Sequence, residues 1–271
     1  MIIDFHTHTF PDAMADKTIA YLAEKSDSVP KSDGKISGLL HCMEESGTDL
    51  SIILPIVTKP SQFDTINRVA YETNETYFKD GKGLLSFGSL FPASVNYMDE
   101  LRIIKDYGFK GIKLHPDYQQ TFIDDPVCEK IIYRASELGL IISIHAGFDP
   151  GWPELTHATP DRILHMLHDV APEKFVLAHM GACLMWDEAE EKLMGQNVYL
   201  DTAYCAPNMP TKQMKRMIAA HGADRILFAT DSPWVSQTDS IRYIQSLGLT
   251  EEQTSQILYK NAQRLLGFSV K

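Results

Sequence analysis

Two histidines stand one residue apart near the start of the chain, in the segment MIIDFHTHTF. In a β-strand successive side chains point to opposite faces, so Asp4, His6 and His8 are expected to share one face. Two imidazoles a few ångströms apart repel each other when both are protonated, whereas a divalent cation binds both in their neutral form. Because a short motif of this kind also occurs by chance, its meaning depends on the rest of the chain.

Further candidate residues lie where other aliphatic runs end. The segments GIKLHP, ISIHAG, LAHMGA and FATDSP contain, in turn, Lys113 with His115, His145, His179 and Asp231. Five of the ten histidines therefore follow aliphatic runs, which random placement would rarely produce. Imidazole and carboxylate groups are the ligands that suit Zn²⁺, Mn²⁺ and Fe²⁺.

From these residues we predict a site for a divalent metal ion, with His6, His8, His145 and Asp231 as its ligands. Three histidines and one aspartate leave a coordination position for water, whose pKa falls toward about 7 when it is bound to zinc. Asp231 can take a proton from that water as well as ligate the ion. His179 then acts as a general acid or base, or orients the substrate.

The elements that must position these residues are eight short aliphatic runs that alternate with amphipathic segments of helical period. The runs are residues 1–5, 50–57, 84–90, 109–114, 140–144, 175–178, 198–200 and 226–229. Helix starts are readable at Pro126 and Pro160, and the last helical pattern covers residues 251–266.

Strands that are buried on both faces and separated by helices form parallel β/α units. Eight such units in about 250 residues predict a closed (β/α)8 TIM barrel, with an open doubly wound sheet as the alternative. No linker or change in composition divides the chain, so we expect a single domain over residues 1–271. In such a barrel the carboxyl ends of the strands carry the active site, which is where the candidate residues lie.

The composition and net charge limit the classes of molecule that the protein is expected to bind. A formal net charge of -11 without a cluster of Lys and Arg argues against a nucleic acid or an anionic membrane as partner, and leaves a small-molecule substrate. No stretch approaches the roughly 20 apolar residues of a membrane span. The four cysteines are widely spread and form no C-x-x-C pair, which indicates a cytoplasmic protein and no structural zinc site.

Taken in order, the segments IDFHTH, GIKLHP, ISIHAG, LAHMGA and FATDSP resemble the metal-dependent amidohydrolase superfamily, and within it the amidohydrolase-related (amidohydrolase 2) branch. That branch contains hydrolases, lactonases and non-oxidative decarboxylases similar to aminocarboxymuconate-semialdehyde decarboxylase. The resemblance covers nearly the whole chain. It implies that His6 and His8 are the ligand pair of the first strand, His145 the ligand of the fifth and Asp231 the carboxylate of the eighth. His179 matches the histidine of the sixth strand, which is catalytic or a second ligand depending on the member.

The resemblance leaves Lys113 and His115 open. In some members of the superfamily a lysine on the fourth strand is carboxylated and bridges two metal ions, whereas one ion per chain is more common in this branch. Lys113 is therefore a bridging carbamate, a cation that meets a substrate carboxylate, or part of a structural ion pair. His115 is a metal ligand, a substrate contact or a polar residue with a structural partner.

Other polar residues are weaker candidates. Asp4 is expected to support the barrel mouth or a ligand histidine, or to contact the substrate. Asp201 is expected to contact the substrate or a ligand histidine, and His157 lies in a long loop that can line the pocket. Four histidines within or at the ends of predicted helices are expected to be structural: His41, His165, His168 and His221.

The predicted function is metal-dependent hydrolysis of an ester, lactone or amide by an activated water, with Zn²⁺ as the favoured ion and Mn²⁺ or Fe²⁺ as alternatives. Non-oxidative decarboxylation of a small unsaturated or aromatic carboxylic acid is the alternative reaction. Few arginines follow the strand ends, which favours hydrolysis because a departing carboxylate needs a cation nearby. A barrel that binds a metabolite without catalysis is a third hypothesis, and a homodimer is the assembly common in this branch.

Overall fold

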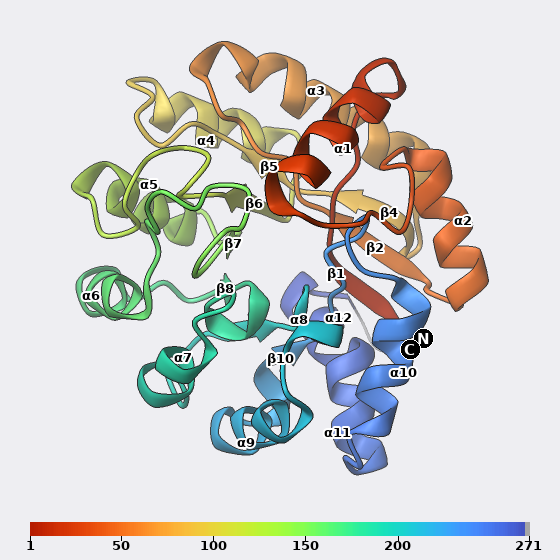
Figure 1. The fold of residues 1–271 in the computed structure, drawn as a ribbon. Helices are drawn as coiled ribbons and strands as arrows, with labels where there is room; N and C mark the ends of the chain where they lie inside the picture. The colour runs from red at the N-terminus through yellow and green to blue at the C-terminus, as the bar shows by residue number, and fades with distance from the viewer. Residues whose placement is uncertain (269–271) are drawn as a thin grey trace.

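The computed structural model describes residues 1–268 as a closed barrel of parallel strands surrounded by helices (Figure 1). The strands are β1 (Ile3–Thr7), β2 (Leu50–Ile53), β3 (Phe78–Lys79), β4 (Lys82–Ser86), β5 (Gly88–Ser89), β6 (Gly111–Leu114), β7 (Ile141–Ile144), β8 (Phe175–Leu177), β9 (Tyr199–Asp201) and β10 (Ile226–Leu227). β4 and β5 form one barrel position interrupted at Phe87, and β3 is a short antiparallel addition to β4. The remaining order gives eight positions, one for each predicted run, so the predicted TIM barrel is confirmed.

The helices follow the strands in the order expected for β/α units. They are α1 (Asp12–Ser26), α2 (Ile36–Ser46), α3 (Phe63–Tyr77), α4 (Tyr97–Asp106), α5 (Pro126–Glu137), α6 (Pro160–Val170), α7 (Trp186–Lys192), α8 (Cys205–Asn208), α9 (Thr211–His221), α10 (Gln237–Ser246), α11 (Glu251–Ser255) and α12 (Asn261–Leu266). Pro126 and Pro160 begin their helices as predicted, and the Thr159 side chain caps α6 by accepting from the backbone N–H of Arg162.

The barrel closes between its first and last strands. The backbone N–H of Phe5 donates to the carbonyl of Phe228 at 2.9 Å, and the N–H of Asp231 donates to the carbonyl of His6 at 2.8 Å. These bonds place the chain after β10 directly beside the end of β1. Residues from opposite ends of the sequence therefore meet at the rim of the barrel.

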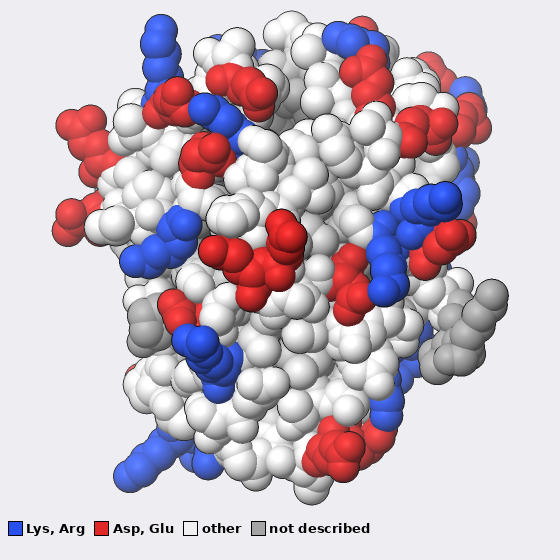
Figure 2. All heavy atoms as spheres, turned by 90° about the vertical axis from the view of Figure 1, so that its right-hand side faces the viewer, with Lys and Arg blue, Asp and Glu red and all other residues white. Residues whose placement is uncertain are grey.

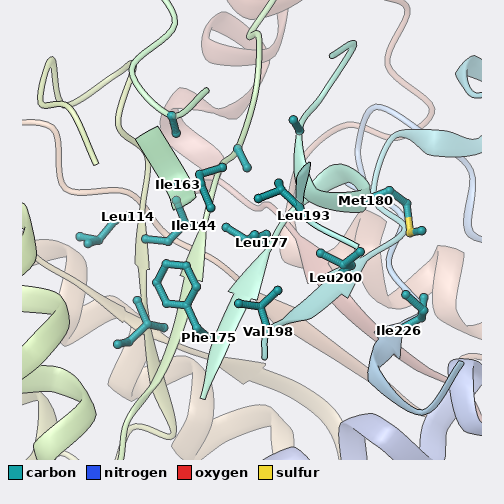
Figure 3. Close-up of a cluster of buried hydrophobic side chains, with 14 of the residues drawn as sticks. Leu114, Ile144, Ile163, Phe175, Leu177, Met180, Leu193, Val198, Leu200 and Ile226 are labelled. Atoms are coloured by element: carbon teal, nitrogen blue, oxygen red, sulfur yellow. The ribbon is translucent and has the colours of Figure 1, made fainter. Parts of the chain in front are cut away.

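Two apolar layers hold the barrel together. Inside it, Phe5 and Phe87 meet edge to face with ring centroids 5.8 Å apart, and both are fully buried. Outside it, strand side chains such as Leu177 and Leu200 pack with Ile163 of α6 and with Leu193, which follows α7 (Figure 3). This second layer fixes the helices around the strands, so the strand ends are rigid supports for the rim.

One prediction about β1 is wrong. The register of β1 against β2 shifts between Asp4 and Thr7, which breaks the two-residue alternation that was expected to place Asp4 beside His6 and His8. The carboxylate of Asp4 instead accepts from the side chains of Thr230 and Gln237, at 2.6 and 2.8 Å. Asp4 is fully buried and supports the turn before Asp231 from behind.

On the face drawn in Figure 2, acidic and basic side chains are interspersed and form no continuous basic patch. Among residues 1–268, no helix combines the length and the apolar character that a membrane crossing requires.

Candidate metal centre

Three of the four predicted metal ligands come together at the rim of the barrel. His6 Nε2 lies 3.1 Å from His8 Nε2 and 3.5 Å from Asp231 Oδ1, and His8 Nε2 lies 3.2 Å from the same carboxylate oxygen. Ligand atoms around a four-coordinate ion with bonds of about 2.1 Å are separated by about 3.4 Å. The spacing of these three atoms therefore fits a divalent ion.

The partners of the other ring nitrogens orient this donor set. His6 Nδ1 lies 3.0 Å from Asp201 Oδ2, and His8 Nδ1 lies 2.9 Å from the carbonyl oxygen of Leu54. Because a carboxylate and a carbonyl only accept hydrogen bonds, both Nδ1 atoms carry the proton of the neutral ring. Each Nε2 atom then presents a lone pair toward Asp231, which is the arrangement that a metal ion requires.

Lys113 of β6 is fully buried next to this donor set. Its Nζ lies 3.2 Å from His6 Nε2, the atom that would ligate an ion. Burial lowers the pKa of Lys113 to about 8, although the charges of Asp201, Asp231 and Asp149 act in the opposite direction. Burial also holds the pKa of His6 well below its usual value, which keeps this imidazole neutral.

His145, the fourth predicted ligand, contacts His179 and is not grouped with the other three predicted ligands. Its Nδ1 is 3.0 Å from His179 Nε2, and its Nε2 faces His115 and Asp149 instead of the first three ligands. The atoms that His115, His145 and Asp149 offer all lie within 4.8 Å of one another. Whether His145 ligates an ion remains a prediction, but the structure places it in a second cluster.

The other predicted residues have distinct places. Asp201 accepts from His6 and also from the backbone N–H of His179, at 2.9 Å, so it orients two of the site histidines. His157 contacts Asp117, with Nδ1 2.8 Å from Oδ1, and is not among the residues that line the cavity. Asp4 accepts from Thr230 and Gln237 and is not among the residues that line the cavity. The four histidines predicted to be structural also stay outside the cavity lining: His41, His165, His168 and His221.

Two carboxylates of the site were not predicted from the sequence. Asp149 lies 3.0 Å from His115 through Oδ2 and Nε2, and Asp117 faces His145 through Oδ2 and Nε2 at 4.0 Å. Both follow a strand-end histidine closely, in the segments HPD and HAGFD, and that spacing was the available signal. It was overlooked because loop residues have no periodicity that predicts their direction.

His179 and Asp231 both adopt left-handed backbone conformations, with φ of 58° and 67°. Such conformations cost about 1–3 kcal/mol for a residue other than glycine and are concentrated at functional sites. Each of the two residues follows the end of a barrel strand, where the chain turns sharply to bring its side chain over the opening.

The two clusters line one cavity of about 680 Å³. Its outer walls are largely apolar and come from α1, the segment after β2, and α3, with residues such as Met14, Leu22, Leu54, Ile66 and Val69. Lys113 is the only Lys or Arg that the described part of the chain contributes to the lining. The cavity therefore combines an end lined by candidate metal ligands, one buried lysine and an apolar body.

Comparison with solved structures shows the same barrel in other proteins. The chain matches an uncharacterized TIM-barrel protein from Bordetella bronchiseptica with a TM-score of 0.78 and 18% identity, over 98% of each chain. It matches 5-carboxyvanillate decarboxylase from Sphingomonas paucimobilis with a TM-score of 0.70 and 15% identity, over 99% of each chain. A dihydroxybenzoic acid decarboxylase from Polaromonas sp. JS666, solved with manganese bound, matches with a TM-score of 0.71 and 18% identity, over 98% of this chain and 96% of the other.

No curated protein matches the sequence. The family model described as Amidohydrolase (Amidohydro_2) matches residues 3–268, which includes every strand of the barrel and all residues of both clusters. The resemblance that the strand-end motifs indicated is thereby confirmed, and the chain belongs to the amidohydrolase 2 family.

Proposed function

We propose that the protein is a metal-dependent decarboxylase that removes CO2, without oxidation, from a small unsaturated or aromatic carboxylic acid. The observation that carries the proposal is Lys113, a buried ammonium group that lines the cavity 3.2 Å from His6 Nε2. From the sequence, hydrolysis was favoured because few arginines follow the strand ends, and a departing carboxylate needs a cation nearby. Lys113 supplies the cation that this reasoning required.

In such a reaction, different residues would bind the ion, pair with the charge of the substrate and contact its apolar part. His6, His8 and Asp231 would hold the ion, with Asp201 keeping the proton of His6 on Nδ1. A bound Mn²⁺ or Zn²⁺ supplies Lewis acidity that polarises an oxygen of the substrate. The ammonium of Lys113 offers a counter-charge to an anionic group, and the apolar walls accommodate a ring or an unsaturated chain.

Loss of CO2 replaces a carbon–carbon bond with a carbon–hydrogen bond, so a proton must reach the carbon that loses the carboxylate. Asp231 and His179 both line the cavity beside the donor set, and we assign to these two groups the relay of this proton from water to the carbon. The decarboxylases among the similar structures support this choice of reaction, although their low identity shows only a common fold.

The test is release of CO2 from hydroxybenzoates and unsaturated acids by protein loaded with Mn²⁺ or with Zn²⁺. We expect Lys113→Met to lower kcat/KM at least 100-fold for the acid that is turned over, with Lys113→Arg retaining more activity because it keeps the positive charge. Metal content of both variants, measured by mass spectrometry, separates loss of the cation from loss of the ion.

Hydrolysis of an ester, lactone or amide is the second candidate. It is favoured by the lack of any arginine among the described residues that line the cavity. Hydrolysis of a lactone or amide panel, with no CO2 from any acid in the presence of either metal, would refute the decarboxylase and establish this alternative.

A further inference from the structure

The cavity at the candidate metal centre extends along one face of α3. The residues of this helix that line it are Thr65, Ile66, Val69, Ala70 and Thr73. Their spacing of one, three and four positions places them on one side of the helix. An α-helix rises 1.5 Å per residue, so the lined stretch from Thr65 to Thr73 is about 12 Å long. We call this part of the cavity the α3 arm, and its other lining residues are Ile36, Ile53 and Ser86.

The α3 arm runs from the protein surface to a buried inner end. Val69 is 36% exposed, whereas Thr73 is 6% exposed and Ser86 is 2% exposed. At the inner end the arm meets a small apolar cluster of α2, β2 and β4, which consists of Leu39, Met43, Ile53 and Leu84. The arm is therefore closed by packed side chains at one end and continuous with the candidate metal centre within the same cavity.

Two asparagines attach α3 to the barrel. Asn67 is fully buried, its Nδ2 donates to the Ser89 carbonyl at 2.8 Å, and its Oδ1 accepts from the Ser89 N–H at 3.0 Å. Two turns further on, Asn74 Nδ2 donates to the Ser86 carbonyl at 3.0 Å. Ser89 Oγ donates to the carbonyl of Lys113 at 2.9 Å, so the same contacts relate α3 to the buried lysine of the site. The wall of the arm is thus formed before a ligand binds, which lowers the entropic cost of binding.

The lining of the α3 arm is apolar in character. None of its residues is charged, and the hydroxyl groups near the inner end already donate to backbone carbonyls. Thr73 Oγ1 donates to the Val69 carbonyl at 2.8 Å, and Ser86 Oγ donates to the Phe87 carbonyl at 3.1 Å. The Asp and Lys side chains of the cavity belong to other parts of its lining, and they are Asp12, Lys113, Asp149 and Asp231. A second carboxylate, a phosphate or a sugar would find no ionic partner in the arm and would lose hydration on entering it.

We propose that the α3 arm is a subsite for an apolar substituent of the substrate. A cavity of about 680 Å³ is that of a drug-sized ligand, and one hydroxybenzoate ring held at Lys113 would leave the arm unfilled. An extended alkyl chain advances by about 1.3 Å per carbon, so a substituent of about six to nine carbons matches the length of the arm. The substrate class is therefore an unsaturated or aromatic acid that carries an alkyl or arylalkyl chain. The position of the acid group rests on the proposed function, whereas the subsite itself does not.

The test measures binding of hexanoate, octanoate and decanoate to the Mn²⁺-loaded protein by isothermal titration calorimetry. These saturated acids lack the unsaturation that the proposed reaction needs, so the heat reports binding alone. Burial of each added methylene is expected to lower Kd about three- to fourfold. Decanoate should therefore bind at least 30-fold more tightly than hexanoate.

Two variants of α3 fill the arm from different positions. Ala70→Leu adds bulk to the wall inside the arm, and Val69→Trp places an indole at its partly exposed outer edge. In both, we expect the ratio of the Kd values of hexanoate and decanoate to fall below fivefold. Val127→Trp is the matched control, because Val127 is an exposed residue of α5 that does not line the cavity, and it should keep the wild-type ratio. Circular dichroism and thermal unfolding confirm that each variant is folded.

Equal Kd values for the three acids, or no measurable binding of decanoate, would overturn the subsite. A gain in affinity with chain length that persists in both Ala70→Leu and Val69→Trp would also overturn it. Release of CO2 is measured separately, from hydroxybenzoates with and without an alkyl chain. Turnover of the unsubstituted acids with no gain on alkylation would overturn the subsite and leave the proposed function standing. Binding that strengthens with chain length, without CO2 from any acid, would support the subsite and refute the proposed function.

Discussion

Replacing Asp201 with asparagine changes one atom that sets the proton position on His6. Asp201 Oδ1 accepts from the backbone N–H groups of His179 and Ala203, at 2.9 and 3.0 Å, and an amide oxygen can accept both. The amide nitrogen then takes the place of Oδ2, where it faces His6 Nδ1 as a second donor. To avoid two facing donors, His6 moves its proton to Nε2, which is the atom that the ion needs.

The expected loss of metal affinity follows from this change of tautomer on His6. Loss of an oriented partner behind a metal-binding histidine lowers metal affinity by about 10–100-fold, or about 1.4–2.7 kcal/mol. The backbone contacts of Asp201 are retained in the variant, so we expect its unfolding temperature without metal to stay close to that of the wild type. The loss is therefore specific to the ion.

Competition against a chromophoric chelator measures the Kd for Zn²⁺ or Mn²⁺ in both proteins. Asp49→Asn is the control, because Asp49 is a partly exposed carboxylate that pairs with Lys82 at 2.8 Å, away from the cavity lining. An Asp201→Asn variant whose Kd stays within threefold of the wild type, while folded, would refute the assignment of His6 Nε2 as a ligand.

Three further predictions concern the barrel and its rim. Phe87→Ala removes a fully buried ring from the barrel interior, and we expect the free energy of unfolding to fall by about 3–5 kcal/mol in urea titrations; a loss below 1 kcal/mol would contradict the close packing. Gly147→Ala places a methyl group against Cys183 at positive φ, and should lower the free energy of unfolding by about 1–3 kcal/mol; unchanged stability would show that the loops can separate. Burial lowers the pKa of His221, whose neutral ring donates to the Val198 carbonyl, so its stabilising contribution is complete above about pH 6.5 and is lost as the pH falls below that value. The difference in unfolding free energy between wild type and His221→Gln should therefore shrink between pH 7.5 and pH 5, and a constant difference would contradict the buried neutral imidazole.

The barrel could be predicted because the sequence patterns that mark its strands and helices are local. Aliphatic runs mark the strands, and Pro126 and Pro160 mark helix starts, so the order of β/α units can be read without tertiary information. Once the barrel is inferred, parallel topology places every strand end at one rim, which is why His6, His8 and Asp231 were expected together and are found together.

What the sequence did not reveal depends on contacts between distant segments. The register shift in β1 that turns Asp4 away arises from pairing with β2, and no feature within residues 1–10 predicts it. The grouping of His145 with His115 and Asp149, instead of with His6, His8 and Asp231, depends on the loop after β7 and on contacts such as that with His179. Asp117 and Asp149 sit in loops, where direction is set by partners such as His157 and Gly147.

The hydrogen bonds that close the barrel between β1 and the segment after β10 join residues that are far apart in the sequence and are therefore synthesised at different times. Asp4 and Thr230, which bond across this closure, are 226 positions apart in the chain. A growing chain on the ribosome thus contains His6 and His8 before it contains Asp231, and all three candidate ligands are present only after the last strand of the barrel has been made. An ion bound by His6, His8 and Asp231, as proposed, would contact both sides of this closure, so its binding would stabilise the pairing of the first and last strands.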